Sequence, residues 1–443
     1  MPSPFQPLSP LDGRYASKMD IIRDYFSDVA LNRARIFVEL RWYITLTQAK
    51  QIPELPKLTD KQDGALFKIF DQFDAQENEK IHEIETKTNH DVKAVEYYLR
   101  ERMTKALGKA FKPEFLHFAL TSEDVNNLAY GSMINGALQE VLVPLMDALI
   151  GLIENLAEAE DATTLLSLTH GQPATPTTLG KELRVFTDRL KRQCAQLMFF
   201  SMHGKFGGAV GNYAAHRAAY PSIDWESLGA TFIAEEMGLD PLRYTTQINP
   251  HDDMAELSHM YGRINTILID LCRDLWMYIS RGVFRQKAIA GEVGSSTMPH
   301  KVNPIDFENA EGNLGLSSAL FSHFAEKLPI SRLQRDLSDS TVQRNIGVAF
   351  GYHVLALSSI GKGLSKLSAD HARIKQELAE HPEVLTEAIQ TVMRKNGITD
   401  AYEQMKALSR GKGVTKESLL AFVQTLKIDA KDKKRLVEIL QAA

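Results

Sequence analysis

The sequence predicts an all-α fold with a bundle of long helices at its centre. Apolar residues recur with the 3.6-residue period of a helix over long segments near residues 138–156, 183–197, 264–278 and 346–367. Long helices with matched apolar stripes are typical of bundles, and we expect these stripes to continue into an oligomer interface. Strand patterns are sparse, with LLSLTHGQ near 165–172 and FGGAVGNY near 206–213 as the two candidates.

Three regions follow one another along the chain. Residues 1–111 carry shorter helical patterns, residues 112–365 hold the long helices, and residues 366–443 form a charged tail of short helices split by HPE, NGITD and RGKG. We expect an N-terminal helical domain, a central long-helix bundle domain and a C-terminal helical domain with these bounds.

The charge balance limits the classes of partner. The 51 Lys and Arg residues against 56 Asp and Glu residues give a formal net charge of −5. Such a balance gives no electrostatic reason to bind nucleic acid or an anionic membrane, so we expect neither partner. An anionic substrate must therefore be attracted by a local cluster of cations.

The compartment is predicted from what the sequence lacks. Cys194 and Cys272 are the two cysteines, and both fall in helical apolar patterns, which favours buried free thiols. MPSPFQPLSPLDGRY has no signal-peptide pattern, and no run of about 18 apolar residues occurs. We expect a reducing, cytoplasmic setting.

Polar clusters interrupt the helical pattern at its boundaries. In TKTNHDVKAVEYYL, Asn89 or Asp91 is a good N-cap, and in TSEDVNNLA the cap is Thr121 or Ser122, with acids in the first turn. A helix N-terminus can also bind an anion. In LPISRLQRDLSDSTVQRN, the three arginines favour either a solvated helix start or an anion site.

Two further clusters are turns or loops. In LTHGQPATPTTLGKEL, His170 precedes a Gly and a Pro among hydrogen-bonding side chains, where a surface role is the commoner one. GEVGSSTMPHKVNP, residues 291–304, is longer than the usual interhelical connection of about 2–8 residues. Its glycines and serines followed by His300 and Lys301 have the composition of a lid that closes on an anion. The usual phosphate-loop, dinucleotide and metal motifs are missing, so we expect no metal and no cofactor.

These motifs together resemble a known family. GSSTMPHKVNP is similar to the signature loop of the aspartase/fumarase superfamily. LDGRY, KTNHDVKAVEYYL, FALTSEDVNN, THGQPATPTTLGKE, GNYAAH, YTTQINPHD and RDLSDSTVQRN resemble its bacterial adenylosuccinate lyase branch, in the expected order from residue 11 to 345. The chain ends at VEILQAA, sooner than we expect for this branch, but this difference touches no site motif.

The resemblance implies a fold and a reaction. The fold has three mostly helical domains, and the central bundles of four chains form a twenty-helix core in a homotetramer with active sites shared between subunits. The reaction is a β-elimination in purine biosynthesis, in which adenylosuccinate gives AMP and fumarate, and SAICAR gives AICAR and fumarate. These small molecules are the expected partners.

The resemblance also assigns roles to residues. His170 matches the general acid and Ser295 the base, while Lys301 stabilises the serine alkoxide and Glu308 hydrogen-bonds His170. His90 orients the substrate. The substrate-binding residues that it implies are Arg14, Tyr15, Asn89, His90, Asp91, Thr121, Ser122, Gln247, Ser296, Asn303, Asn309, Arg335, Ser340, Thr341 and Arg344.

Other functions stay open at this point. Another member of the superfamily, such as argininosuccinate lyase, would share the loop but differ in its succinyl substrate. A non-catalytic scaffold with this fold need not keep His170, Ser295 and Lys301, all of which are present. A helical module that binds acidic peptides predicts an exposed basic stripe, which the sequence lacks.

Overall fold

The computed structural model describes residues 6–287, 298, 300–409 and 413–442, and these residues form two compact units. Unit 1 comprises Met1–Ala148, Leu190–Ile269 and Asn309–Ser359. Unit 2 comprises Leu149–Arg189, Asp270–Glu308 and Ile360–Ala443. Both are mostly helical, so the predicted all-α class is confirmed, while the division into domains 1–111, 112–365 and 366–443 stays a prediction.

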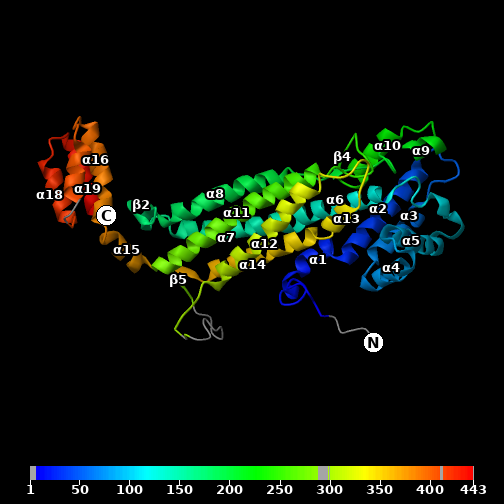
Figure 1. The fold of residues 1–443 in the computed structure, drawn as a ribbon, viewed down its shortest axis with the longest axis horizontal. Helices are drawn as coiled ribbons and strands as arrows, with labels where there is room; N and C mark the ends of the chain where they lie inside the picture. Colours follow the sequence, from blue (N-terminus) through cyan, green and yellow to red (C-terminus); the bar gives the residue numbers. More distant parts are fainter. Residues whose placement is uncertain (1–5, 288–297, 299, 410–412, 443) are drawn as a thin grey trace. The chain divides into compact units, whose positions relative to one another are not determined.

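Unit 1 contains the N-terminal helices, drawn in blue and cyan in Figure 1. Its helices are α1 (Asp20–Phe26), α2 (Asp28–Gln48), α3 (Asp60–Asp71), α4 (Ala75–Thr88), α5 (Asp91–Leu107), α6 (Ser122–Ala137), α9 (Ala214–Ala219), α10 (Trp225–Thr231) and α13 (Ser338–Gln343). Short 3₁₀ or π turns are η1 (Ala16–Lys18), η2 (Gly108–Ala110), η3 (Pro113–Phe115), η4 (Leu138–Leu142) and η5 (Phe232–Glu236). Helix α2 packs against α1, α3, α5 and α6, which makes it the central helix of this group.

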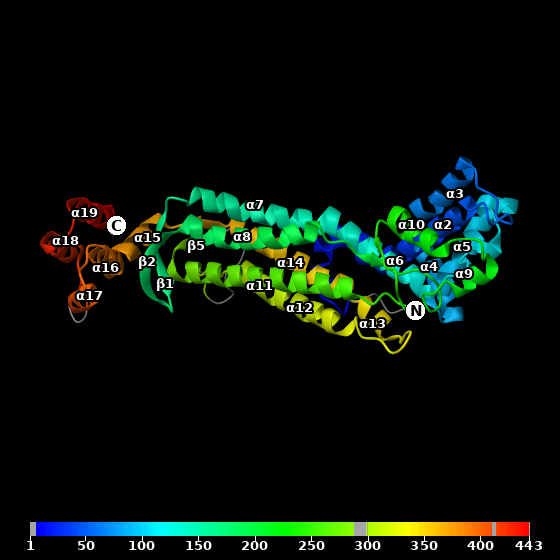
Figure 2. The same ribbon diagram turned by 90° about the horizontal axis from the view of Figure 1, so that it is seen from above.

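The four segments predicted as long helices are helical, except that the last one ends at Ser365 and Leu367 begins strand β6 (Leu367–Ala369). The boundaries between the units fall within the long helices α7 (Val143–Ala159), α8 (Leu179–Met198), α11 (Asp252–Arg281), α12 (Ile305–Lys327) and α14 (Ile346–Ser365). Inside unit 1, Asn265 of α11 donates to Ser317 of α12 at 3.1 Å and bonds His353 of α14 at 2.7 Å. The unit 1 parts of these three helices therefore lie side by side, as Figure 2 shows.

Aromatic side chains fill the interior of unit 1. Trp42 of α2 is fully buried, with its ring centroid 4.7 Å from that of Phe206 and 5.2 Å from that of Phe232. A second group joins the bundle helices, where Tyr261 and Phe350 lie 5.0 Å apart. Aromatic pairs at these separations stabilise a core beyond their simple burial.

Strands are few and short in the described chain. The prediction near 165–172 is confirmed, because β1 (Thr164–Thr169) and β2 (Gln172–Thr178) form an antiparallel hairpin in unit 2. The prediction near 206–213 is wrong, because that segment is a series of turns with positive φ at its glycines. The remaining pairs are β3 (His203–Gly204) with β4 (Asp240–Pro241), and β5 (Phe284–Gln286) with β6 (Leu367–Ala369).

The C-terminal part of unit 2 has its own apolar core. It is built by α15 (His371–Ala379), the 3₁₀ turn η6 (Pro382–Leu385), α16 (Thr386–Lys395), α17 (Ala401–Ser409), α18 (Lys416–Thr425) and α19 (Ala430–Ala442), drawn in orange and red in Figure 1. Ile389, Met393 and Leu419 are fully buried in this core, and Leu166 of strand β1 belongs to the same cluster. The hairpin is thus packed on the C-terminal helices, as Figure 2 shows for β1 and α15.

Two sequence expectations about apolar segments can be checked. Cys194 and Cys272 are free and buried, as predicted. The stretch Ser122–Ala159 is long and apolar enough to cross a membrane by length and composition alone. Its first turns carry Glu123 and Asp124, which are buried and form ion pairs inside unit 1, and 44% of its apolar window is buried.

Candidate active site

The predicted site residues divide between the two units. Ser295 and Ser296 lie outside the described residues. Unit 2 carries His170, Lys301, Asn303 and Glu308. Unit 1 carries the others, namely Arg14, Tyr15, Asn89, His90, Asp91, Thr121, Ser122, Gln247, Asn309, Arg335, Ser340, Thr341 and Arg344.

The junction between α4 and α5 places Asn89, His90 and Asp91. Asn89 ends α4 in the left-handed conformation, with φ 50°, which asparagine tolerates better than most residues. The predicted N-cap is wrong, because His90 caps α5 and accepts from the Lys93 N–H through Nδ1 at 3.2 Å. Because His90 caps the helix, the Asp91 carboxylate bonds other groups.

Asp91 lies between two arginines. Its Oδ2 accepts from Arg35 Nη2 at 2.7 Å and from Arg344 Nη2 at 2.9 Å. Burial by itself raises the pKa of the Asp91 carboxyl, but the Arg35 guanidinium, the Val92 N–H and Arg344 outweigh burial and hold that pKa below its usual value. Asp91 is therefore a carboxylate at neutral pH, and it fixes the position of the exposed Arg344.

A second carboxylate holds another arginine, Arg335. Glu123 in the first turn of α6 is 2% exposed, and its Oε1 accepts from Arg335 Nη2 at 2.9 Å. Arg335 Nη1 also donates to Gln247 Oε1 at 3.2 Å, and Gln247 Nε2 donates to the Ala209 carbonyl at 2.8 Å. This chain of bonds joins α6, the segment before α13 and the glycine-rich turns in one network.

The N-terminus of α6 is fixed by a buried ion pair. Thr121 caps this helix as predicted, and its N–H donates to Asp124 Oδ2 at 2.8 Å. Lys205 Nζ lies 2.6 Å from Asp124 Oδ1, and neither side chain is exposed to solvent. The Gly208 N–H also donates to Asp124, at 3.0 Å. These bonds position Thr121 and Ser122 at the helix start, where free N–H groups favour an anion.

The segment that leads into Thr121 is strained and anchored. His117 and Ala119 have φ values of 56° and 57°, which L-residues rarely adopt. The His117 ring bonds Glu39 of α2 through Nδ1 at 2.5 Å. Burial lowers the pKa of the His117 imidazole, but the Glu39 carboxylate outweighs burial and raises it above its ordinary value.

The N-terminal segment reaches the bundle through Tyr15. Its hydroxyl accepts from Asn309 Nδ2 of α12 at 3.2 Å, and Asn309 in turn accepts from Ser359 at 2.8 Å. The Arg14 guanidinium lies 5.7 Å from the Tyr15 ring centroid and is exposed. A cavity of about 310 Å³ is lined by this segment, through Asp12, and by Arg344. The Tyr15–Asn309 hydrogen bond therefore joins the N-terminal segment to α12 within unit 1.

Helix α13 carries the remaining unit 1 residues. Ser340 is partly buried, and its N–H donates to Asp339 at 2.7 Å, while Thr341 is exposed. Gln343 is buried and bonds His251 at 3.0 Å. This bond holds the end of α13 directly before Arg344.

In unit 2, His170 stands at the tip of the hairpin. Thr169 pairs with Gln172, so His170 and Gly171 form a two-residue turn with φ values of 54° and 71°. Positive φ at both central residues is the signature of a type I′ turn, which matches the twist of the strands. The His170 side chain is exposed, and none of the described residues hydrogen-bonds to it.

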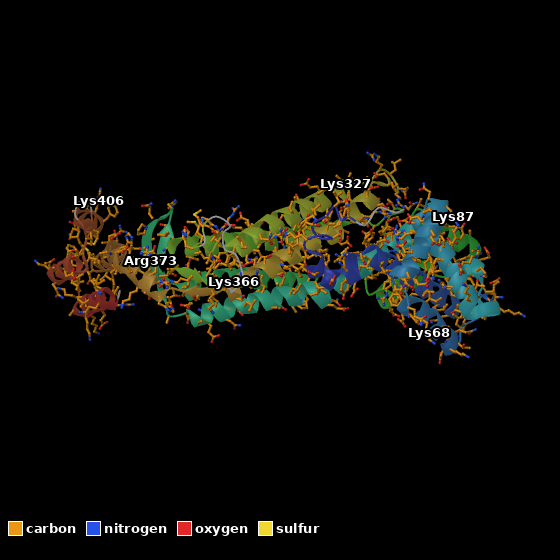
Figure 3. The ribbon with its side chains drawn as sticks, turned by 90° about the horizontal axis from the view of Figure 1, so that it is seen from below. Lys68, Lys87, Lys327, Lys366, Arg373 and Lys406 are labelled. Carbon is orange, nitrogen blue, oxygen red and sulfur yellow. The ribbon has the colours of Figure 1, made fainter. Side chains whose placement is uncertain are left out.

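Two hydrogen bonds anchor the described residues that follow Lys301. Gln286 of β5 donates to the Val302 carbonyl at 2.9 Å. At the start of α12, Asp306 accepts from Lys366 Nζ at 2.8 Å, and Lys366, labelled in Figure 3, is buried. The Lys301 side chain is exposed, and Asn303 is partly buried.

Glu308 bonds a residue other than the predicted one. Its Oε1 accepts from Trp276 Nε1 of α11 at 3.1 Å. Among the described residues it does not bond His170, so the pairing that the resemblance implies stays a prediction. Within the described chain, no three His, Cys, Asp or Glu side chains lie close enough together to hold a metal ion.

Several residues of the network were missed by sequence reasoning. Arg35, Asn126 and Lys205 fall within ordinary-looking patterns, and the acids of TSED were explained by the helix dipole alone. A signal was present, because Glu123, Asp124, Asn126 and Asn127 gather four polar side chains in the first turns of α6, and all four are buried. Buried polar side chains are as a rule hydrogen-bonded, so such a cluster predicts partners elsewhere in the chain.

Comparison with known proteins identifies the class and then the family. A family model described as "Lyase" matches residues 13–316, so the chain is a lyase built on a helical bundle. A second model, described as "Adenylosuccinate lyase C-terminal", matches residues 331–443. The chain belongs to the adenylosuccinate lyase family.

Curated relatives agree over nearly the whole chain. The adenylosuccinate lyase of Legionella pneumophila (strain Corby) is 51% identical over 432 residues, which cover 98% of this chain and 94% of the relative. The Escherichia coli (strain K12) protein of the same name is 49% identical over 97% of this chain and 94% of its own length. The Haemophilus influenzae protein is 48% identical over 98% of this chain and 95% of its own.

A solved structure supports the fold alone. The 3-carboxy-cis,cis-muconate lactonizing enzyme from Pseudomonas putida aligns with a TM-score of 0.73 over 94% of this chain and 92% of its own. Its sequence is 19% identical, so the likeness concerns the arrangement of helices.

Proposed function

We propose that this enzyme splits adenylosuccinate into AMP and fumarate, and SAICAR into AICAR and fumarate. The observation that carries the proposal is the identity of about half of all residues to proteins named adenylosuccinate lyase over nearly full length. The cationic network of unit 1 supports it, because both substrates carry a phosphate and two carboxylates. This network has a net positive charge, because it contains three guanidinium groups and two carboxylates. They belong to Arg35, Arg335, Arg344, Asp91 and Glu123.

The proposed chemistry is a β-elimination. A base removes a proton from the succinyl carbon next to a carboxylate, and the electron pair of that C–H bond becomes the second bond of fumarate as the C–N bond breaks. The departing nitrogen takes a proton from a general acid, so proton and electron pair balance. Proton exchange with water then restores both groups. Positive charge must stabilise the dianionic carboxylate that forms.

His170 is the proposed general acid and Ser295 the proposed base. An imidazole has an ordinary pKa of about 6.5, which suits proton donation at neutral pH. Its exposed position at the tip of a tight turn supports this role, because the turn holds the ring away from its own strands. A serine is basic only as its alkoxide, which requires a nearby cation and the exclusion of water. Lys301 is the proposed cation.

Glu308 and the polar residues of both units complete the proposal. Glu308 hydrogen-bonds His170 of another subunit and raises its basicity, in a homotetramer with shared active sites and a twenty-helix core. Its position on an exposed face of α12 is compatible with such a contact. Arg14, Tyr15, Arg335, Ser340 and Arg344 bind the phosphate end, and the other predicted residues bind the rest of the substrate. We propose a cytoplasmic location and the three-domain division given above.

The test follows adenylosuccinate absorbance with the purified protein. His170→Ala should lose elimination and keep substrate binding, Ser295→Ala should retain uncleaved adenylosuccinate in a crystal, and Lys301→Met should affect turnover more than binding. Near-normal turnover in His170→Ala would remove this residue from the mechanism. Light scattering of the purified protein tests the tetramer.

A related activity is tested in the same assay. Argininosuccinate lyase activity would require cleavage of argininosuccinate, and each succinyl substrate can be offered separately. Cleavage of argininosuccinate alone would overturn the proposed substrate while leaving the reaction class unchanged.

A further inference from the structure

Arg35 of α2 is a buried cation at the centre of the unit 1 network. The residue is 3% exposed, and three of its N–H groups are used. Nε donates to Asn126 Oδ1 at 2.9 Å, Nη1 to Asn32 Oδ1 at 2.9 Å and Nη2 to Asp91 Oδ2 at 2.7 Å. A buried guanidinium bonded in this way has one fixed orientation, because its donors form a rigid planar fork.

Two chains of bonds run from Arg35 to Arg344 and Arg335. The first passes through Asp91, whose Oδ2 is shared with Arg344 at 2.9 Å. The second passes through Asn126, whose Nδ2 donates to Glu123 Oε1 at 2.9 Å, and Glu123 accepts from Arg335 at 2.9 Å. Arg335 and Arg344 are residues of the proposed phosphate end, whereas Arg35 belongs to no motif that predicted the site.

We propose that Arg35 is a positioning residue that holds Arg344 and Arg335 in place for the phosphate of the substrate. It acts on Arg344 through Asp91, and on Arg335 through Asn126 and Glu123. This inference deepens the proposed function and rests on it, since it requires that the two arginines bind a phosphate monoester. Arg35 itself, being buried, does not touch the substrate.

The electrostatic reason lies in the carboxylate between the arginines. Without Arg35, the negative charge of Asp91 would be balanced by Arg344 alone, and the pair would offer little attraction to an incoming phosphate. With Arg35 present, Asp91 is already neutralised from the buried side, so the charge of Arg344 remains available to a ligand. Glu123 is likewise held by Asn126 while it orients Arg335. The pocket is thereby arranged before the phosphate arrives, which lowers the cost of binding.

The test measures AMP binding by calorimetry and the steady-state kinetics of adenylosuccinate cleavage. In Arg35→Met, we expect the Kd of AMP and the KM of adenylosuccinate to rise by about 10- to 100-fold, the equivalent of about 1.4–2.7 kcal/mol. The kcat should stay within about 3-fold, because the removed interaction is made equally by the ground and transition states. A merely structural role would not separate KM from kcat in this way.

A conservative substitution and a control variant distinguish an effect on AMP binding from an effect on folding. Arg35→Lys keeps the buried charge but cannot bond Asn126, Asn32 and Asp91 in one plane, so we expect a rise in the AMP Kd of about 3- to 10-fold. Arg41→Met is the matched control, since Arg41 lies on the same helix in a partly buried ion pair with Glu236. That variant should leave the AMP Kd unchanged.

A double variant tests the connection itself. Adding Arg35→Met to Arg344→Met should weaken AMP binding by less than Arg35→Met weakens it in the wild-type protein, because one of the two chains of bonds is then already broken. Full additivity would overturn the path through Asp91.

The remaining outcomes separate this inference from the proposed function. If Arg344→Met weakens AMP binding and Arg35→Met has no more effect than Arg41→Met, the role of Arg35 is overturned and the phosphate pocket stands. If neither Arg344→Met nor Arg335→Met changes the AMP Kd, the phosphate assignment fails, and the role of Arg35 fails with it.

Discussion

The two units hold their predicted site residues in different ways. In unit 1, Asp91, Arg335 and Arg344 belong to one continuous network of bonds that includes fully buried charges. In unit 2, the His170 and Lys301 side chains are exposed. The difference teaches that the groups proposed to bind the substrate are arranged by the chain itself. The two unit 2 groups proposed to act in turnover lie at the tip of a turn and shortly before helix α12.

The physical reason for the difference lies in what each kind of group must do. Arginines that bind a phosphate gain from fixed positions, since every unfixed side chain adds an entropic cost on binding. An acid must exchange its proton with water in each cycle, so an exposed imidazole is suitable. The comparison predicts that changes to the network residues of unit 1 affect folding and binding, whereas changes to His170 and Lys301 of unit 2 affect turnover.

The largest expected effect follows from removing the His170 imidazole. Because the native φ is 54°, His170→Asn is the informative variant, since asparagine accepts this conformation. We expect kcat to fall by about 10²- to 10⁴-fold, as for the loss of a general acid, with the AMP Kd unchanged. Thermal unfolding of this variant should match that of the wild type. A large fall in AMP affinity would contradict the separation between the units.

The next effect concerns the buried Lys205–Asp124 pair. Lys205→Met leaves the Asp124 carboxylate buried without its cation, and we expect the free energy of unfolding to fall by about 3–5 kcal/mol. Urea unfolding measures this change. Lys87→Met, at an exposed lysine of α4 labelled in Figure 3, is the control and should change little. A small effect of Lys205→Met would show that unit 1 does not depend on its buried charges.

A pH effect of intermediate size is expected from His117. Its pKa is raised in the folded protein, so the charged imidazole stabilises the fold. This contribution is complete below the ordinary pKa of about 6.5 and is lost as pH rises through the higher folded value. Urea unfolding of wild type and His117→Gln over this pH range should differ in slope, with less pH dependence in the variant. Equal slopes would assign the pH dependence to other groups.

The smallest effect is expected at an exposed hydrogen bond of the hairpin. Thr175 of β2 bonds Glu387 of α16 at an exposed position, so Thr175→Val should change stability by less than about 0.5 kcal/mol and leave kcat unchanged. Leu166→Ala removes a buried side chain from the same hairpin and should cost about 2–5 kcal/mol. A large effect of Thr175→Val would show that surface bonds, and not the apolar core, hold the hairpin.

The sequence predicted the structural features that depend on residues close together in the chain. The long helices follow from their apolar period, and the β1–β2 hairpin follows from a short strand pattern before a His-Gly turn. The cap at Thr121 was predicted from its residue type, whereas the cap at the start of α5 was not, because histidine is an uncommon N-cap.

What the sequence could not predict depends on pairs far apart in the chain. Lys205 and Asp124 are 81 residues apart, and Arg344 and Asp91 are 253 residues apart. No local pattern marks such partners, since each alone has an ordinary explanation as a solvated charge or a helix-dipole contact. The site motifs came from family resemblance, and the structure adds the buried residues that connect them.

The tight turn under His170 has a consequence for how this enzyme can change over evolution. Because the connection between the strands has two residues, a single insertion would shift the register of both strands and reorient the imidazole. Length variation should therefore accumulate in the C-terminal connections and stay absent between Thr169 and Gln172, even where the neighbouring residue types drift.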